Sequence, residues 1–474
     1  MKIEQIYTGC LSQAAYYIES NGEAAIIDPL REISPYLDLA QKRKTSIKYI
    51  FETHFHADFV SGHIDLAKAT GSKIVIGPTE VDLGYVAVKG IDGQIFKIGN
   101  ISIQLIHTPG HTPESSCYLL KDENGIENAL FTGDTLFIGD VGRPDLAQHL
   151  IAELTQEKLA GLLYDSLHNK ILPLNDNLTI YPTHGAGSAC GKNMSKETSD
   201  TLGHQKKTNY ALQPELSKDD FIKELTNGLL PPPGYFPKNV WMNIHGYDSI
   251  QNVLARGSKA LTIPEFEFIA NESRAIILDT RKPDEFCKGF IPNSINIGID
   301  GNFAVWAGTL IPDINQEILL VAEYGREEEI ITRLARVGYD HAIGYLKGGF
   351  EAWEKENKEI DTIISITADE FALLVNENSN SSILDVRKPS EYESGHIESS
   401  VNAPLDNISA QMSLLDDNQT TYVHCGGGYR SMIFASILRA RGYRNIIDIA
   451  GGFSAIKKSG KFKITLNMGG NKRP

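Results

Sequence analysis

The sequence predicts an α/β protein of three domains, and three observations lead to this prediction. The chain has 474 residues, and at about 150 residues per domain this length suggests about three domains. In the first half, short runs rich in β-branched and aromatic residues alternate with segments of helical period, which is typical of an α/β fold. In the second half, one stretch of sequence occurs twice, which indicates a duplicated domain.

Composition and charge exclude several classes of protein. Hydrophobic residues make up 41% of the chain and charged residues 22%, so there is enough apolar surface for several cores. The net charge of −15 argues against a nucleic-acid partner, because phosphate backbones attract clustered positive charge. The five cysteines are an odd and small number, so we expect a reducing, cytoplasmic compartment. No run of 18 apolar residues occurs, so neither a membrane-spanning helix nor a membrane partner is expected.

The first 249 residues contain the predicted alternation of strands and helices. Strands or strand ends are expected at 16–20, 24–29, 48–54, 73–77, 101–111, 117–120, 129–134 and 179–185. Helices are expected at 37–44, 61–70 and 151–169. A further helix and the triple proline Pro231 to Pro233 follow, and a proline-rich stretch of this kind suits an extended connection after a domain.

The duplicated unit is about 105 residues long. The segment from Ala275 aligns with the segment from Ser382, and seven identical residues recur at an offset of 106. These pairs include Asp279 with Asp385, Arg281 with Arg387 and Asn296 with Asn402. The period is far longer than that of a solenoid repeat, so we expect two tandem domains. The predicted boundaries are 1–249, 250–360 and 361–474.

Metal-binding residue types follow four of the predicted strands. His54, His56 and Asp58 come directly after the strand at 48–54, and side chains two residues apart can converge on one ion. His111, Asp134 and His184 each follow another strand. Four strand ends that each deliver a histidine or an aspartate predict a preformed metal cup.

The four motifs THFHADFVSGH, TPGHTPESS, FTGDTLF and YPTHG resemble the ordered motifs of the metallo-β-lactamase fold over roughly residues 1–200. This resemblance implies an αββα sandwich followed by two smaller α/β domains. The hydrolases of this fold generally carry a second histidine after the aspartate of the first motif, which serves a second metal. Here Phe59 follows Asp58, and a benzyl ring cannot bind a metal, so a mononuclear centre is favoured.

The one-metal branch that the sequence most resembles is the persulfide dioxygenases. That resemblance implies one Fe(II) per chain held by His54, His111 and Asp134, with zinc as the alternative metal. Two imidazoles and one carboxylate leave open positions on Fe(II) for dioxygen and substrate. A ligand set that included His56 would suit zinc better, but by resemblance His56 lies beside the iron without binding it. We expect His56, Asp58 and His184 to line the site.

Two further segments resemble parts of persulfide dioxygenases. The stretch DVGRPDL contains Arg143 and resembles a segment whose arginine helps to hold an anionic thiol substrate. The stretch GAGSACGK contains Cys190 and resembles a loop of dioxygenases that are fused to sulfurtransferases. Cys190 lies six residues after His184, and it could carry a sulfane sulfur or simply fill the loop.

The predicted third domain contains a strand, a glycine-rich loop and a helix in the segment YVHCGGGYRS. Glycines let successive N–H groups point inward, and a helix N-terminus adds positive potential, so this loop can cradle an anion. Both effects lower the pKa of the Cys425 thiol, and Arg430 can neutralise a bound anion. The expected cradle consists of Gly426, Gly427, Gly428, Tyr429 and Ser431.

Four residues separate Cys425 from Arg430, and this short loop resembles that of rhodanese, a sulfurtransferase. The resemblance covers most of residues 361–474 and implies a persulfide on Cys425. In the middle copy, Ala322 or Glu323 occupies the cysteine position, so we expect a rhodanese-like domain without rhodanese chemistry.

The whole chain resembles the persulfide dioxygenase–rhodanese fusions of sulfide detoxification. This resemblance implies that a thiol persulfide and O2 give sulfite and thiol, and that Cys425 then combines sulfite and sulfane sulfur into thiosulfate. A homo-oligomer, dimer or tetramer, is expected. Two alternatives stay open: a zinc thioester hydrolase of the glyoxalase II type with an appended sulfurtransferase, and a non-catalytic sensor of persulfide at Cys425 or Cys190. The thiol carrier, whether glutathione, coenzyme A or bacillithiol, also stays open.

Overall fold

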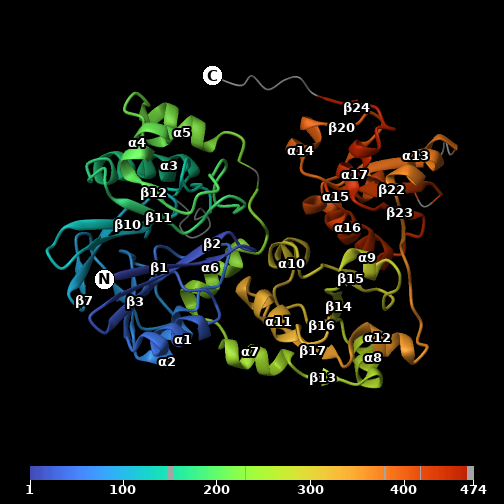
Figure 1. The fold of residues 1–474 in the computed structure, drawn as a ribbon, viewed down its shortest axis with the longest axis horizontal. Helices are drawn as coiled ribbons and strands as arrows, with labels where there is room; N and C mark the ends of the chain where they lie inside the picture. Colours follow the sequence, from blue (N-terminus) through green and yellow to red (C-terminus); the bar gives the residue numbers. More distant parts are fainter. Residues whose placement is uncertain (147–153, 230, 378–380, 417, 467–474) are drawn as a thin grey trace. The chain divides into compact units, whose positions relative to one another are not determined.

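The structure is a computed structural model that describes residues 1–146, 154–229, 231–377, 381–416 and 418–466. The chain divides into two compact units (Figure 1). The first unit contains Met1–Val253 together with Thr332–Asp340, and the second contains Leu254–Ile331 and the chain from His341 onward. Among the described residues, no helix is long and apolar enough to cross a membrane.

Two six-stranded sheets form the centre of the first unit. The first sheet contains, in spatial order, β1 (Lys2–Thr8), β2 (Gln13–Ser20), β3 (Glu23–Ile27), β4 (Ser46–Phe51), β5 (Lys73–Ile76) and β6 (Val88–Lys89). The second contains β12 (Asp200–Thr201), β11 (Thr179–Pro182), β10 (Glu127–Gly133), β9 (Ser116–Lys121), β8 (Ile101–His107) and β7 (Ile95–Ile98). Strands therefore occur at all eight of the segments predicted for this part of the chain.

The alternation of side chains along these strands produces four layers. In β2, Tyr16 and Ile18 pack with Tyr118 and Leu120 of β9 in a core between the two sheets. Residues of the opposite parity face the helices instead: Tyr17 packs with α1 and α2, and Leu119 packs with α3 and α5. The helices of the unit are α1 (Ser34–Arg43), α2 (His63–Thr70), α3 (Gln156–Ser166), α4 (Leu202–Thr208), α5 (Lys218–Thr226), α6 (Phe236–His245) and α7 (Ile250–Gly257), the last of which spans the division between the units.

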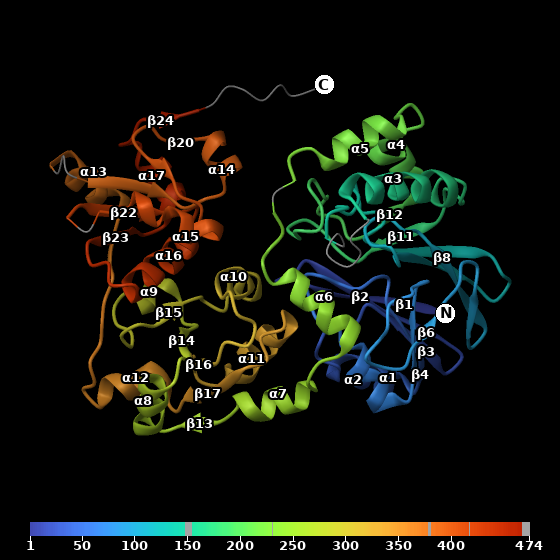
Figure 2. The same cartoon turned by 180° about the vertical axis from the view of Figure 1, so that it is seen from behind.

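Figures 1 and 2 show from opposite sides that α1 and α2 lie on one side of the strands and α3 to α5 on the other. The predicted αββα sandwich is thus confirmed. The helix expected over 151–169 begins at Gln156, where the Thr155 side chain accepts a hydrogen bond from the backbone N–H of Lys158 and caps the first turn. Its first three predicted residues, 151–153, lie outside the described residues.

The second unit contains the duplicated domain as two five-stranded parallel sheets of the same strand order. We call the first copy the middle repeat; its order is β13 (Ala260–Leu261), β17 (Ala342–Leu346), β16 (Ile318–Val321), β14 (Ile276–Asp279) and β15 (Ile295–Asn296). The second copy, the C-terminal repeat, has the order β18 (Ile364–Ile366), β23 (Ile446–Ile449), β22 (Thr420–His424), β19 (Ser381–Asp385) and β21 (Val401–Asn402). A small sheet pairs β20 (His396–Ile397) with β24 (Ile464–Thr465).

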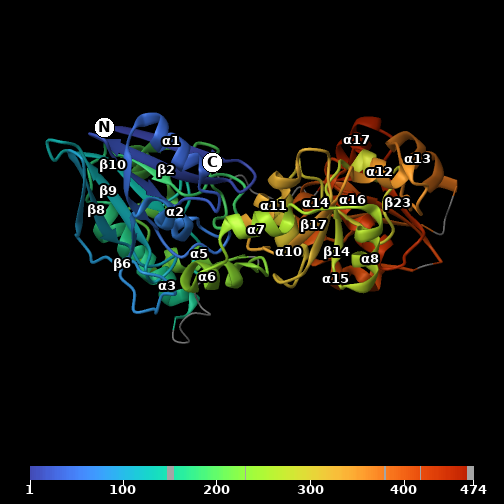
Figure 3. The ribbon, with the colours of Figure 1, turned by 90° about the horizontal axis from the view of Figure 1, so that it is seen from below.

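Helices flank both parallel sheets, as Figure 3 shows from below. The middle repeat has α8 (Ile263–Glu272), α9 (Pro283–Phe286), α10 (Phe303–Leu310), α11 (Glu327–Arg336) and α12 (Gly349–Lys355). The C-terminal repeat has α13 (Ala368–Glu377), α14 (Pro389–Ser394), α15 (Ile408–Gln411), α16 (Tyr429–Ala440) and α17 (Gly452–Ser459). Identical strand order in the two copies agrees with the duplication that the sequence predicts.

Candidate metal centre and cysteine loop

Strand ends of both sheets bring the predicted metal ligands of the first unit together. His54 follows β4, His111 follows β8 and Asp134 follows β10. One ligand atom from each of these three buried residues lies within 4.8 Å of the other two. The distances from Asp134 Oδ2 are 3.8 Å to His54 Nε2 and 3.4 Å to His111 Nε2. Gly133 lets the strands approach closely, because a Cβ atom there would lie 2.7 Å from the Thr53 side chain.

The hydrogen bonds around the two histidines direct their Nε2 atoms toward Asp134. His111 Nδ1 lies 2.7 Å from the carbonyl oxygen of Arg143 and donates to it. The Thr53 hydroxyl donates to Asp28, so it accepts from His54 Nδ1 at 2.9 Å. Both rings therefore leave the Nε2 lone pair free, which is the usual arrangement of metal-binding histidines.

The three ligands fit a divalent metal ion. Burial lowers the pKa of His54 and of His111, so both imidazoles are neutral at physiological pH. Among the described residues, His54 Nε2 and both carboxylate oxygens of Asp134 have no hydrogen-bond partner. Buried polar atoms without a partner are costly, and a bound cation would satisfy all three of them.

A second group of predicted residues adjoins this triad. His184 follows β11, its Nδ1 lies 3.2 Å from the Ser12 carbonyl oxygen, and its Nε2 lies 3.3 Å from Asp58 and 3.7 Å from Asp134. Burial alone would lower the pKa of His184, but the carboxylates of Asp58 and Asp134 outweigh it and raise the pKa. Phe59 is fully buried, and its ring stacks on His56 at 4.2 Å. Phe59 thus adds no ligand beside Asp58 and His184.

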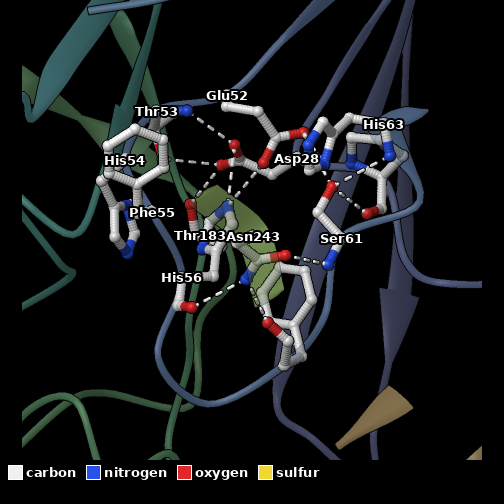
Figure 4. A network of polar contacts seen from close by, with 12 residues as sticks. Asp28, Glu52, Thr53, His54, Phe55, His56, Ser61, His63, Thr183 and Asn243 are labelled. Carbon is white, nitrogen blue, oxygen red and sulfur yellow. Dashed lines mark hydrogen bonds and ion pairs between the residues drawn. The ribbon is translucent and has the colours of Figure 1, made fainter. Parts of the chain in front are cut away.

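His56 lies against two carboxylates, those of Asp28 and Glu52 (Figure 4). Its Nε2 lies 3.1 Å from Asp28 Oδ1 and 3.4 Å from Glu52 Oε2. Burial would lower the pKa of His56, but these two carboxylates raise it to about 10. His56 is buried, and its ring centroid lies 4.2 Å from that of His54, so it adjoins the triad.

Sequence reasoning missed the residues that support this loop. Asp28 accepts hydrogen bonds from Thr53 and Thr183, and Glu52 accepts one from Ser61 (Figure 4). Asn243 of α6 donates to the carbonyl oxygens of His56 and Phe59 at 2.8 Å. Asp28 and Glu52 stand at the ends of predicted strands, which could have indicated them, whereas no local pattern indicates Asn243.

Arg143 and Cys190 lie close to each other at the same site. Cys190 is buried, and one ligand atom each from Cys190, Asp134 and His184 lie within 4.8 Å of one another. Burial, with the nearby carboxylates, raises the pKa of the Cys190 thiol to about 12. The Arg143 guanidinium donates to both carboxylate oxygens of Asp145 at 2.6 Å and to the Ala189 carbonyl oxygen. Arg143 thus fixes the loop that carries Cys190.

The cysteine loop of the C-terminal repeat has the predicted form. Cys425 follows β22, is 1% exposed, and its Sγ accepts a hydrogen bond from the Gly428 N–H at 3.1 Å. Gly428 has a φ of 101°, a conformation that favours glycine, and α16 begins at the next residue. The Ser431 hydroxyl donates to the Gly428 carbonyl oxygen. The thiol therefore accepts from a backbone N–H just before a helix N-terminus.

Arg430 of the cysteine loop is paired with an acidic side chain. Its guanidinium donates two hydrogen bonds to Glu391 of α14, which raise the pKa of the arginine. In the middle repeat, the matching loop begins with the buried Ala322 and contains Tyr324, which is 95% exposed. This loop has no thiol.

Comparisons with known proteins agree with these folds. Residues 8–184 match the model of the metallo-beta-lactamase superfamily, and residues 263–356 and 367–459 each match that of the rhodanese-like domain. A crystal structure of a metallo-beta-lactamase from Staphylococcus aureus subsp. aureus COL is 33% identical, with a TM-score of 0.63, and the match covers 73% of this chain and 98% of that one.

Two curated relatives carry different activities in their names. A probable hydroxyacylglutathione hydrolase of Schizosaccharomyces pombe is 31% identical over 205 residues, 42% of this chain and 74% of that protein. The human mitochondrial persulfide dioxygenase ETHE1 is 30% identical over 213 residues, 44% of this chain and 74% of that protein.

The chain belongs to the metallo-beta-lactamase superfamily, and two rhodanese-like domains follow that domain. This domain order confirms the architecture of a persulfide dioxygenase–rhodanese fusion. The fold implies a metal, and the buried histidines and aspartates provide groups that could hold it. Because the hydrolase and the dioxygenase are similar to this chain at nearly equal identity, the reaction is not decided by identity alone.

Proposed function

We propose that the chain oxidises a low-molecular-weight thiol persulfide with O2 and then passes sulfane sulfur through Cys425. It would thus be a persulfide dioxygenase and a thiosulfate sulfurtransferase. The observation that supports this most is the presence, in one chain, of a neutral two-histidine, one-carboxylate site and a buried cysteine in a glycine loop. We assign the first reaction to residues 1–249 and the second to 361–474, with 250–360 as a rhodanese-like domain without a catalytic cysteine.

The first reaction is RSSH + O2 + H2O giving RSH and sulfurous acid, in which the terminal sulfur is oxidised and O2 is reduced. His54, His111 and Asp134 would hold one Fe(II) per chain. When bound, the iron would supply the redox chemistry that lets O2 react with a sulfur atom. The chain keeps its two imidazoles neutral by burial, so they can serve as ligands without losing a proton.

The second reaction uses Cys425 as a nucleophile. Its thiolate attacks the terminal sulfur of a second RSSH, so that a new S–S bond forms, the RS–S bond breaks and RS⁻ leaves. Sulfite then attacks the outer sulfur of the Cys425 persulfide, the bond to Cys425 breaks, and thiosulfate and a proton are released with the thiolate regenerated. The N–H of Gly428 at 3.1 Å from Sγ stabilises the thiolate in both steps.

A zinc thioester hydrolase of the glyoxalase II type is the second candidate, since the hydroxyacylglutathione hydrolases are similar at the same level. Such an enzyme needs a second metal site, and the buried Phe59 ring disfavours it. A persulfide sensor would bind at Cys425 or Cys190 without turnover.

The deciding experiment measures O2 uptake by iron-loaded protein with the persulfides of glutathione, coenzyme A and bacillithiol. We expect about one iron per chain, O2 uptake with at least one persulfide, and sulfite and thiosulfate as products. Cys425→Ser should abolish thiosulfate formation and leave O2 uptake unchanged, while Cys287→Ser serves as the matched control. Two zinc ions per chain with thioester hydrolysis and no O2 uptake would refute the proposal, and loss of O2 uptake in Cys425→Ser would refute the separation of the sites.

Two further assignments belong to this proposal. The loop held by Arg143 would meet the anionic part of the thiol carrier, and Cys190 would carry sulfane sulfur near the metal. We also propose a homo-oligomer, dimer or tetramer, which sedimentation analysis of the full chain would test.

A further inference from the structure

Tyr429 of the cysteine loop reaches from the C-terminal repeat into the middle repeat. Its hydroxyl donates a hydrogen bond of 2.6 Å to the carbonyl oxygen of Gly298, 131 residues earlier in the chain. Both residues belong to the second unit. Tyr429 is the first residue of α16 and directly follows the last glycine after Cys425. The copy without a cysteine therefore contacts the loop of the copy that has one.

Two glycines of the middle repeat make room for the Tyr429 ring. A Cβ atom at Gly301 would lie 2.4–2.9 Å from three ring carbons, and one at Gly298 would lie 3.3 Å from the ring. Neither described glycine has a positive φ, so the backbone conformation does not itself require glycine there. Pro404 and Asn407 stand at the matching positions of the C-terminal repeat. The glycines thus fit the close approach of the ring, and only the middle copy has them.

The segment that contains these glycines is fixed within the middle repeat. The Ile299 N–H donates to the Thr280 carbonyl oxygen at 3.0 Å. Asp300 accepts a hydrogen bond of 2.8 Å from Arg326, which lies in the loop that replaces the cysteine loop in this copy. The contact site for Tyr429 is therefore held from two sides.

A second contact holds α16 against the same segment. The backbone N–H of Asn296, at the end of β15, donates to the Ser436 hydroxyl of α16 at 3.0 Å, and both residues are fully buried. The Asn296 side chain in turn donates to the carbonyl oxygens of Asp279 and Arg281. Helix α16 is thus attached to the middle repeat at two points, its first residue and its eighth.

The cysteine loop itself has few side chains that could fix it. Gly426, Gly427 and Gly428 follow Cys425, and a Cβ atom at Gly427 would have no neighbour within 4 Å. Three consecutive glycines lose much conformational freedom when they are ordered. We infer that Tyr429 is a positioning residue, and that the middle repeat holds the start of α16 and the N–H groups facing Cys425 in place through it. The inference rests on the proposed sulfurtransferase role of Cys425.

The test uses the full chain with Tyr429→Phe, which removes the hydrogen bond, and Gly301→Val, which fills the space of the ring. Tyr443→Phe is the matched control, because its hydroxyl has no hydrogen bond among the described residues. The first readout is the rate of Cys425 alkylation by iodoacetamide against pH, measured on the Cys425 peptide by mass spectrometry. The second is kcat and KM for sulfur transfer from a thiol persulfide to sulfite, measured as thiosulfate formed.

We expect alkylation at pH 7 to slow about fivefold in Tyr429→Phe and more in Gly301→Val, with a lower kcat for sulfur transfer in both. Tyr443→Phe should match the wild type. Wild-type pH profiles and kcat in both test variants would overturn the inference. If Gly301→Val fails to fold by circular dichroism, Tyr429→Phe alone decides. A wild-type chain that transfers no sulfur would refute the proposed function, whereas the alkylation profiles would still test the positioning.

Discussion

Arg430 and Glu391 form a two-pronged ion pair in the C-terminal repeat, with Nη1–Oε2 and Nη2–Oε1 distances of 2.6 and 2.8 Å. Glu391 lies on α14 and Arg430 in the first turn of α16. The carboxylate fixes the plane of the guanidinium beside the Cys425 loop. A sulfur oxyanion that enters the loop therefore meets an arginine that is already oriented and partly neutralised.

Arg430→Lys should keep the positive charge but lose the planar fork that matches Glu391. We expect kcat/KM for thiosulfate to fall about tenfold, which corresponds to the loss of one charge-assisted hydrogen bond. Steady-state sulfur-transfer kinetics would measure this. Arg441→Lys, an exposed site, is the control, and equal activity of Arg430→Lys and the wild type would contradict the expected role of the fork.

Asp134→Asn should remove metal from the first unit. The substitution replaces the anionic ligand of the triad with a neutral amide, which attracts a divalent cation less strongly and leaves it only the two neutral imidazoles. We expect the iron content to fall from about one per chain to below about one tenth, as measured by plasma mass spectrometry. Asp122→Asn, a half-buried loop residue outside the triad, should keep the metal, and full metal content in Asp134→Asn would show that the triad is not the site.

Phe59→His should create a second metal site. The new imidazole would join Asp58 and His184, whose facing atoms lie 3.3 Å apart. Zinc titration should then give about two ions per chain, against an expected one for the parent chain. Phe59→Leu is the control for lost packing, and a ratio of one in Phe59→His would mean that Phe59 does not determine the metal count.

Asp448→Asn should stabilise the C-terminal repeat at neutral pH. Burial raises the pKa of Asp448 from 3.8 to about 6, although the Ser365 hydroxyl donates to it. Because the folded pKa lies above the unfolded one, this group favours folding below about pH 4, and that contribution is lost as the pH rises through about 6. The raised pKa of Asp448 lowers the free energy of unfolding at pH 7 by about 3 kcal/mol, relative to an aspartate with an ordinary pKa.

Thermal unfolding of the wild type and of Asp448→Asn between pH 4 and pH 7 would measure this difference. The stability gap should open in favour of the variant as the pH rises. A gap that stays constant over this range would show that Asp448 keeps an ordinary pKa. Asp406→Asn, an exposed site of the same repeat, provides the control.

The strand-end residues could be predicted from the sequence because each one follows a recognisable local pattern. His54, His111, Asp134 and His184 all come at the end of an apolar run, and sheet geometry then brings them together. Cys425 could be predicted for the same reason, because the strand, the three glycines and the helix around it form one short continuous sequence pattern.

The partners of these residues could not be predicted in the same way. Glu391 meets Arg430 across 39 residues, and Asn243 reaches His56 across 187. Such pairs depend on how helices pack on sheets, which no local pattern encodes. Arg143 illustrates the same limit: the motif indicated an anion-binding residue, and the structure shows its guanidinium bound to Asp145 and to the backbone of the Cys190 loop.

The close contact of Tyr429 with Gly298 and Gly301 also limits which residues can occupy these positions of the duplicated domain. A side chain at Gly301 would overlap the Tyr429 ring, and one at Gly298 would crowd it, so the residues that fit at these two positions of the middle repeat depend on a side chain of the C-terminal repeat. The middle copy has no thiol in its matching loop, and its contribution to the cysteine loop is the carbonyl oxygen of Gly298 and the space beside Gly301.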